Sequence, residues 1–425
     1  SLVGSEMCIR DRDLRRLPRH GFHCGVREHL ETLCSFLPDR RPGSDGNRQA
    51  TAYVADHLAR FGWDVSTPEF QVMDWRTDGG EVRVVGSAIE VTPSPYGLGV
   101  ATTGPIRVVR EVADLDRPDL GGSIVVLDGA LAAEPFTPKG YPFYRSDEHT
   151  AIVAALEAAA PAAVLAVTGK YPALCGALDP FPLIEDGDFT IPTANLRPGD
   201  VAPLLDADGV TASLEIRSER WRSTAANVVA TRGMPAPRIT VIAHIDTKPG
   251  TPGAVDNAAG VVVLLMLAEL LGPQRVPDLP IGVELLVVNG EDHYGAPGEL
   301  AWLADHEAHL EDIPLVINID GAGYRGGRTA YSTYNLDADL ARHVDATLRA
   351  APTLIPGAEF YQSDHAIFAM RGRPAVAITT ELVDEMLDTL FHSPDDTPSQ
   401  VDMGLLIDAA DGIAKLIRTY PGASE

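Results

Sequence analysis

The chain has 425 residues, of which 45% are apolar and 22% are charged. This composition is typical of a globular protein that is long enough for two domains with separate cores. The formal net charge of −26 disfavours nucleic acids and anionic membranes as partners, because both would repel the chain.

The first dozen residues, 1–12, resemble a translated sequencing-adapter remnant, and we leave them out of the fold prediction. If the native start is missing, the lack of a signal peptide carries no information about the compartment. No apolar run approaches the roughly 20 residues needed to span a bilayer. We therefore expect a soluble protein, and the choice between cytoplasm and secretion stays open.

The four cysteines show neither a CxxC pair nor a zinc-ribbon spacing. They are Cys8, Cys24, Cys34 and Cys175. A bridge between Cys24 and Cys34 is one alternative, but free or buried thiols are favoured.

Residues 13–85 are predicted to form the first part of a catalytic domain. Apolar side chains recur at helical spacing across residues 46–61, which predicts a helix that ends at Gly62. A strand-like stretch follows from Trp63 to Trp75.

Residues 86–216 differ in composition, because proline and glycine are dense and short β-like runs dominate. The predicted strands are 106–109, 123–127, 162–167 and 190–194, with one helix over 147–159. The segment lacks any cluster of histidines and carboxylates. We therefore predict a small β-rich domain inserted into the catalytic one. Whether it gates substrate size or pairs two chains as a homo-oligomer is left open.

Residues 217–425 are predicted to form the second part of the catalytic domain. Continuous apolar runs predict strands at 239–243, 283–288, 315–319 and 375–379. Helical spacing predicts a buried helix over 258–271 and amphipathic helices over 301–310, 336–349 and 405–419. Alternating strands and helices predict an α/β fold with a mostly parallel sheet sandwiched by helices.

Five short segments of this part are expected to be strands that each end in a metal-capable or acid/base side chain. The residues are His244 and Asp246, Asp256, Glu291 and Asp292, Asp320, and His392. In an open α/β sheet, side chains at the carboxyl ends of strands converge on one site. Two imidazoles and several carboxylates suit a pair of zinc ions, whose four positive charges three aspartates and a hydroxide would offset.

The same motifs resemble the zinc exopeptidases that include bacterial leucyl aminopeptidases, glutamate carboxypeptidase and the transferrin receptor ectodomain. The matching motifs are Ala-His244-Ile-Asp246, Gly-Ala-Val-Asp256-Asn, Asn-Gly-Glu291-Asp292, Asn-Ile-Asp320 and Phe-His392-Ser-Pro-Asp-Asp396. Their order and spacing cover residues 238–400. The resemblance implies a phosphorylase/hydrolase-type fold, a di-zinc exopeptidase that hydrolyses terminal peptide bonds, and a protease-associated domain for the inserted region.

The resemblance also implies a ligand set. His244 and His392 would each bind one zinc, and Asp256 would bridge both ions. Asp320 would join His244, and Asp292 would join His392. The family usually has glutamate where this chain has Asp292, and the shorter side chain withdraws the carboxylate by roughly 1.5 Å.

Two further roles and one backbone feature follow from the resemblance. Glu291 would be the general base that takes a proton from the attacking water and passes it to the leaving amine. Asp246 would hold His244 through its free ring N–H. The Asp256–Asn257 peptide is expected to be cis. Phe391 stands where the family often has a tyrosine, so it cannot donate to an oxyanion.

Further polar residues are predicted to lie near the site or on the surface. Ser363, Asp364 and His365 are predicted to line a substrate pocket, in which loops 324–335 and 359–368 take part. For His293, a position next to the metal ligands and a solvated loop are equally favoured. His306 and His309 are expected on the surface.

An aminopeptidase is favoured among the activities of this scaffold. The alternatives are a carboxypeptidase, an amide hydrolase or a glutaminyl cyclase, and cyclases of this kind typically bind one zinc. A catalytically inactive, receptor-like binding protein is the alternative from another class. It is disfavoured because the chain keeps all five metal-capable positions and the base.

Overall fold

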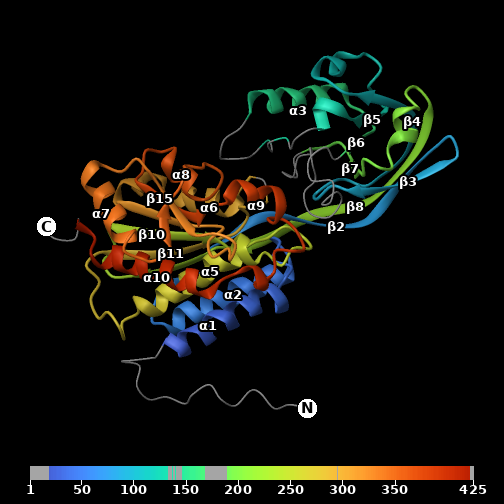
Figure 1. The fold of residues 1–425 in the computed structure, drawn as a ribbon. Coiled ribbons are helices and arrows are strands. Elements are labelled where there is room, and N and C mark those ends of the chain that lie inside the picture. The colour runs from blue at the N-terminus through green and yellow to red at the C-terminus, as the bar shows by residue number, and fades with distance from the viewer. Residues whose placement is uncertain are drawn as a thin grey trace, which may run out of the picture.

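The computed structural model describes residues 19–132, 136, 139, 146–167, 189–293 and 295–421. The adapter-like segment 1–12 lies outside the described residues, as do Cys8 and Cys175. Cys34 is buried with a free thiol, as predicted. Figure 1 shows a large α/β body and a smaller β-rich body that are joined by two long strands, β2 and β8.

The α/β body is built on an eight-stranded sheet in the order β1-β9-β11-β10-β12-β15-β13-β14. Its four central strands are parallel: β11 (Gly282–Val288), β10 (Arg238–His244), β12 (Leu315–Ile319) and β15 (Ala375–Thr380). The flanking strands are β1 (Asp64–Ser66), β9 (Val228–Arg232), β13 (Thr329–Tyr334) and β14 (Leu354–Pro356). Strand β9 is antiparallel to β11, and β13 is antiparallel to β15. The predicted α/β fold is thus confirmed, with its parallel strands at the centre of the sheet.

The prediction of a loop over 324–335 is wrong for its second half. Residues 329–334 form β13 and pair with 375–380 of β15. This strand contains threonine, serine and tyrosine instead of a continuous apolar run, so the pattern that revealed the central strands did not apply to it.

Helices cover both faces of the sheet. One face packs against α1 (Arg19–Glu31), α2 (Asp45–Arg60), α5 (Ala259–Leu270), α7 (Ala338–Leu348) and α10 (Met403–Arg418). The other face packs against α6 (Pro297–His306) and α8 (His365–Ala369). A short helix, α9 (Val383–Thr389), precedes His392. Among the described residues, no helix is both long and apolar enough to cross a membrane.

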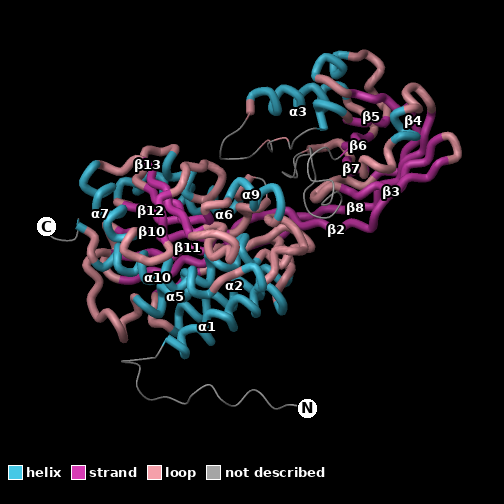
Figure 2. Tube along the Cα trace, in the orientation of Figure 1, coloured by secondary structure: helices cyan, strands magenta, loops and turns pink. Residues whose placement is uncertain are grey.

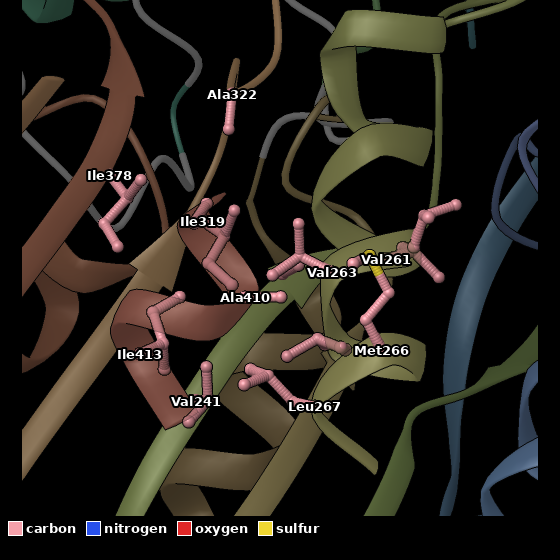
Figure 3. Packing of buried hydrophobic residues seen from close by; sticks show 14 of the residues in the cluster. Val241, Val261, Val263, Met266, Leu267, Ile319, Ala322, Ile378, Ala410 and Ile413 are labelled. Carbon is pink, nitrogen blue, oxygen red and sulfur yellow. The ribbon is translucent and has the colours of Figure 1, made fainter. Parts of the chain in front are cut away.

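The helical layers explain the continuous apolar strands. In β10, Val241 packs on the side of α5 and α10, whereas Ile242 belongs to the cluster on the opposite face. Figure 3 shows Val241 of β10 beside Ile413 of α10 and Leu267 of α5. Each such side chain contributes about 1.5–3 kcal/mol when fully buried. The sheet edge where the strands end is therefore a rigid platform for a site.

The smaller body is a closed barrel in the order β2-β3-β7-β6-β5-β4-β8. Its strands are β2 (Glu69–Val84), β3 (Ser87–Pro93), β4 (Val100–Val109), β5 (Ile124–Leu127), β6 (Ala163–Val167), β7 (Thr193–Leu196) and β8 (Thr211–Ala226). Its helices are α3 (Asp147–Ala159) and α4 (Ala202–Leu205). Strands β2 and β8 pair along their length and lead back to the α/β body (Figure 2). The barrel thus includes strand residues on both sides of the predicted segment 86–216.

Candidate metal centre

The predicted site residues lie at the same edge of the sheet, some of them at strand ends and the others in turns. His244 is the last residue of β10, Asp320 follows β12 directly, and Glu291 and Asp292 follow β11 after a short turn. These placements agree with the predicted strand ends.

The other two predicted strands are wrong. Residues 254–257 form an irregular turn that leads into α5, in which Asp256 and Asn257 have non-helical backbone angles. His392 lies in a turn after α9. Gly253, with φ of 56°, turns the chain before Ala254. A Cβ at Gly253 would lie 2.2 Å from a methyl carbon of Thr247, so only glycine fits there.

The carboxylate of Asp256 lies between the two imidazoles. Its Oδ1 is 3.2 Å from Nε2 of His244, and its Oδ2 is 3.2 Å from Nε2 of His392. Asp320 Oδ1 lies 3.4 Å from His244 Nε2, and Asp292 Oδ1 lies 2.8 Å from His392 Nε2. The structure therefore brings the five predicted ligands together in the predicted pairs.

The donor atoms of this cluster suit a cation. Nε2 of His244 and Oδ2 of Asp292 are buried and have no hydrogen-bond partner among the described residues. Buried polar atoms are seldom left in this state without a ligand. Imidazole nitrogen and carboxylate oxygen are the ligands that zinc prefers in catalytic sites.

The charges of the cluster also favour the binding of cations. Burial opposes ionisation of His244, but Asp246, Asp256 and Asp320 outweigh it and raise the pKa of that imidazole well above its ordinary value. Burial raises the pKa of Asp292, and the nearby Asp256 carboxylate raises it further. The group of carboxylates is thus more stable when cations lie among them.

The Asp256–Asn257 peptide is cis, as predicted. The Asn257 side chain is fully buried and holds this turn against the sheet. Its Nδ2 donates to the carbonyl of Ile319 at 2.8 Å, and its Oδ1 accepts from the amide of Gly260 at 3.0 Å. The turn that carries Asp256 is thereby fixed to β12 and to the start of α5.

Asp396 ties the turn of Asp256 to the turn of His392. Its carboxylate accepts hydrogen bonds from the amides of Val255 at 2.8 Å and Asp256 at 3.0 Å. Its carbonyl accepts from the amide of Ala254 at 3.1 Å. Because these bonds satisfy the amides of the turn, residues 254–256 need no strand partner.

Arg40 is a structural residue that the sequence did not reveal. Its guanidinium is fully buried between the turn that follows α1 and the loop that precedes Asp256. It donates to four backbone carbonyls at 2.7–3.0 Å, those of Leu33, Ile245, Pro252 and Gly253. An arginine in a polar segment is usually exposed, so no local pattern could have identified this one.

Asp246 lies beside the free ring nitrogen of His244, with its backbone carbonyl closer than its carboxylate. Nδ1 of His244 lies 3.2 Å from the backbone carbonyl of Asp246 and 3.7 Å from its carboxylate. The carboxylate accepts hydrogen bonds from the amides of Gly290 at 2.6 Å and Asp292 at 3.1 Å. Asp246 therefore orients the loop of the acid pair, while its carbonyl is the closer partner of the His244 ring.

Glu291 faces the cluster without pairing closely with any ligand. Its Oε2 lies 3.9 Å from Nε2 of His244. Burial raises its pKa well above the ordinary value; His244 opposes this rise, whereas the carboxylates of Asp320 and Asp364 add to it. A carboxylate that favours a proton in this position has the properties of a general base.

Ser363 and His365 are buried beside Asp320. The Ser363 hydroxyl donates to Oδ2 of Asp320 at 2.7 Å and accepts from Nδ2 of Asn318 at 2.7 Å. Nε2 of His365 donates to the carbonyl of Phe360 at 2.8 Å, and burial lowers the pKa of this imidazole to about 4. Their predicted contact with substrate stays a prediction.

Asp364 is also fully buried, next to a second buried carboxyl, Glu299. Neither carboxyl has a hydrogen-bond partner among the N–H and O–H groups of the described residues. Burial raises the pKa of Asp364 well above its ordinary value, and the nearby Glu299 adds to this rise. Burial and the neighbouring carboxyl therefore both favour the protonated form of Asp364.

The remaining histidines differ in exposure. His309 is exposed, and His306 stacks on Trp302. His293 is 1% exposed, so of its two predicted positions the one next to the metal ligands applies. Burial lowers the pKa of His293 to about 3.

Known proteins share both the sequence pattern and the fold of this chain. The family model of peptidase family M28 matches residues 227–417. YfbL of Escherichia coli is 30% identical over 233 residues, which cover 45% of this chain and 70% of YfbL. The chain belongs to peptidase family M28. The predicted peptidase family is thereby confirmed, and the chain is a peptidase of that family.

Other relatives extend the likeness to the barrel. LpqL of Mycobacterium tuberculosis, named as a probable lipoprotein aminopeptidase, is 24% identical over 90% of this chain and 80% of its own length. An aminopeptidase from Aneurinibacillus sp. strain AM-1 has the same fold, with a TM-score of 0.72, 19% identity and 93% of each chain covered. BSAP, a zinc aminopeptidase from Bacillus subtilis, has a TM-score of 0.70 and 18% identity over 92% of this chain and 93% of its own. That the barrel is a protease-associated domain stays a prediction.

Proposed function

We propose that this chain is a two-zinc aminopeptidase, which hydrolyses the first peptide bond of a substrate with a free amino end. The observation that carries the proposal is the position of Asp256, whose two carboxylate oxygens each lie 3.2 Å from a different imidazole. A carboxylate in this position suits a bridge between two ions. The aminopeptidases among the relatives support the choice of the amino end.

Five side chains would hold the two ions. His244 and Asp320 would bind one zinc, His392 and Asp292 would bind the other, and Asp256 would bind both. Zinc bound there would supply Lewis-acid polarisation of the scissile carbonyl and would acidify water. The short separation of 2.8 Å between Asp292 and His392 supports the view that an aspartate reaches this site despite its shorter side chain.

Glu291 would carry the proton in the reaction. Its carboxylate takes a proton from the water whose oxygen attacks the scissile carbonyl carbon. It then gives this proton to the amide nitrogen as the C–N bond breaks, so that a free carboxylate and a free amine leave. Asp246 supports this role, because its hydrogen bonds to Gly290 and Asp292 hold the backbone on both sides of Glu291.

A hydrolysis screen tests the proposal. The substrates are leucine p-nitroanilide, its N-acetylated form, and N-blocked peptides with a free carboxyl end, each with and without a chelator. We expect hydrolysis of the free-amino substrate alone and its loss on chelation. Cleavage of only the N-blocked peptides would instead indicate a carboxypeptidase.

The variant Glu291→Gln separates catalysis from metal binding. It should keep its zinc and lose at least about 100-fold in kcat, which is the lower end of what a general base contributes. Full activity of this variant would remove Glu291 from the proposed role.

A further inference from the structure

Tyr96, in the turn between β3 and β4 of the inserted barrel, contacts a residue next to the proposed metal centre. Its hydroxyl lies 3.2 Å from Nδ1 of His293, and the two rings meet edge to face at 6.0 Å. Tyr96 is 2% exposed and His293 is 1% exposed, so water does not compete for this contact. His293 follows the proposed ligand Asp292 directly in the chain.

The direction of this hydrogen bond follows from the other side of the imidazole. Nε2 of His293 lies 3.0 Å from the carbonyl of Thr247, which can only accept, so Nε2 carries the proton. Nδ1 is then an acceptor, and the Tyr96 hydroxyl donates to it. The ring of His293 is thus held at both nitrogens, by the catalytic domain and by the barrel.

The loop that contains Asp292 is held at both ends. Asp246 binds the amides of Gly290 and Asp292 at its start. At the end of this loop, the ring of His293 is held by the carbonyl of Thr247 and by the hydroxyl of Tyr96. Thr247 follows Asp246 directly in the chain. Among these partners, Tyr96 is the one that comes from the barrel.

Tyr96 is itself held in an unusual backbone conformation. Its φ is 56°, in the left-handed region that L-residues rarely adopt. Arg220 of β8 donates to its carbonyl at 3.0 Å, and the Trp75 ring of β2 packs against its ring at 5.6 Å. The two long strands of the barrel therefore fix the direction of the Tyr96 side chain.

We propose that Tyr96 is a positioning residue for the metal centre, and that through His293 it fixes the backbone that carries Asp292. The inserted barrel thereby completes the zinc site of the catalytic domain. This inference rests on the proposed function, in which Asp292 binds zinc. Without the hydroxyl, Nδ1 of His293 is buried and unpaired, and the His293 ring loses one of its two anchors.

Zinc titration of the metal-free protein by calorimetry tests the inference, with the variants Tyr96→Phe and Tyr53→Phe. Tyr53 is the matched control, because its hydroxyl lies 2.6 Å from Nδ1 of His29, in a pair between α2 and α1. We expect Tyr96→Phe to weaken the second zinc-binding step by about 10-fold, as is usual for partners of metal ligands. Tyr53→Phe should leave both steps unchanged, and equal zinc affinities for the two variants would overturn the proposal.

The variant His293→Phe tests whether Tyr96 acts through His293. Phenylalanine keeps an aromatic ring but has no nitrogen, so it offers no acceptor to the Tyr96 hydroxyl. In this background, Tyr96→Phe should have no further effect on zinc affinity. A second, additive 10-fold loss would show that Tyr96 acts by another route and would contradict the inference. A wild-type chain that binds no zinc would overturn the proposed function itself.

Discussion

The carboxylate of Asp396 accepts a hydrogen bond from the backbone amide of Asp256 at 3.0 Å, and so holds the proposed bridging ligand by its main chain. Asp396 lies four residues after His392, and Nε2 of His392 lies 3.2 Å from Oδ2 of the Asp256 carboxylate. The two proposed ligands are therefore linked both through the site and through the backbone beneath it. Such a link keeps their spacing fixed before any ion binds.

Asp396→Asn should weaken zinc binding. One atom of the asparagine amide is a donor, so it cannot accept from both amides of the turn, and one buried N–H loses its partner. We expect about 10-fold lower zinc affinity and a loss of about 1–3 kcal/mol in the free energy of unfolding. Chelator competition and urea unfolding measure the two effects. The exposed neighbour Asp395→Asn is the control, and equal behaviour of the two variants would contradict this role.

Arg40→Lys should destabilise the fold although it keeps the charge. The guanidinium binds four carbonyls in a fixed plane, whereas an ammonium group has three donors and cannot span them. At least one buried carbonyl is then unpaired, which costs about 1–3 kcal/mol. Urea unfolding checks this, with the exposed Arg48→Lys as control. An unchanged free energy of unfolding would mean that the four contacts contribute nothing.

Ser363→Ala should affect the zinc that His244 and Asp320 bind. The hydroxyl donates to Asp320 Oδ2 at 2.7 Å, which leaves Oδ1 to face His244. Without it, Asp320 can rotate, and we expect about 10-fold weaker binding of one zinc ion. Calorimetric titration of the metal-free variant measures the change, and Ser363→Thr, which keeps a hydroxyl, should recover part of the affinity. Wild-type affinity in the alanine variant would exclude this role.

Glu299→Gln should change how stability depends on pH. Burial raises the pKa of Glu299 from 4.5 to about 8, although its contact with Asp364 lowers it in part. Between these values the folded state binds more protons than the unfolded state, so stability falls as pH rises. Glutamine removes this dependence, and the melting temperature of the variant relative to the wild type should rise from pH 5 to pH 8. The exposed Glu385→Gln is the control, and a difference that does not change with pH would contradict the prediction.

Much of the fold could be predicted because the central strands are buried on both faces. Their apolar runs stand out, and so does α5, which is buried all round. Strand β13 was missed because its threonines, serine and tyrosines give no such run. The extent of β2 and β8 was missed because their residues are mostly polar or alternate in burial over 16 positions.

The proposed ligands could be picked out because each is a residue type that binds zinc and the motifs stand in a known order. Their supporting residues could not. Arg40 acts through backbone carbonyls far away in the sequence, and Tyr96 lies almost 200 positions before its partner, His293. Contacts of this kind depend on how segments far apart in the chain pack together, and neither composition nor spacing records them.

The zinc content of the purified protein, determined by mass spectrometry of the metal at known protein concentration, tests the central claim most directly. We predict two zinc ions per chain for the wild type and a loss of zinc in Asp256→Ala, which removes the ligand shared by both ions. One ion or none in the wild type, or two ions retained without the Asp256 carboxylate, would contradict the proposed centre.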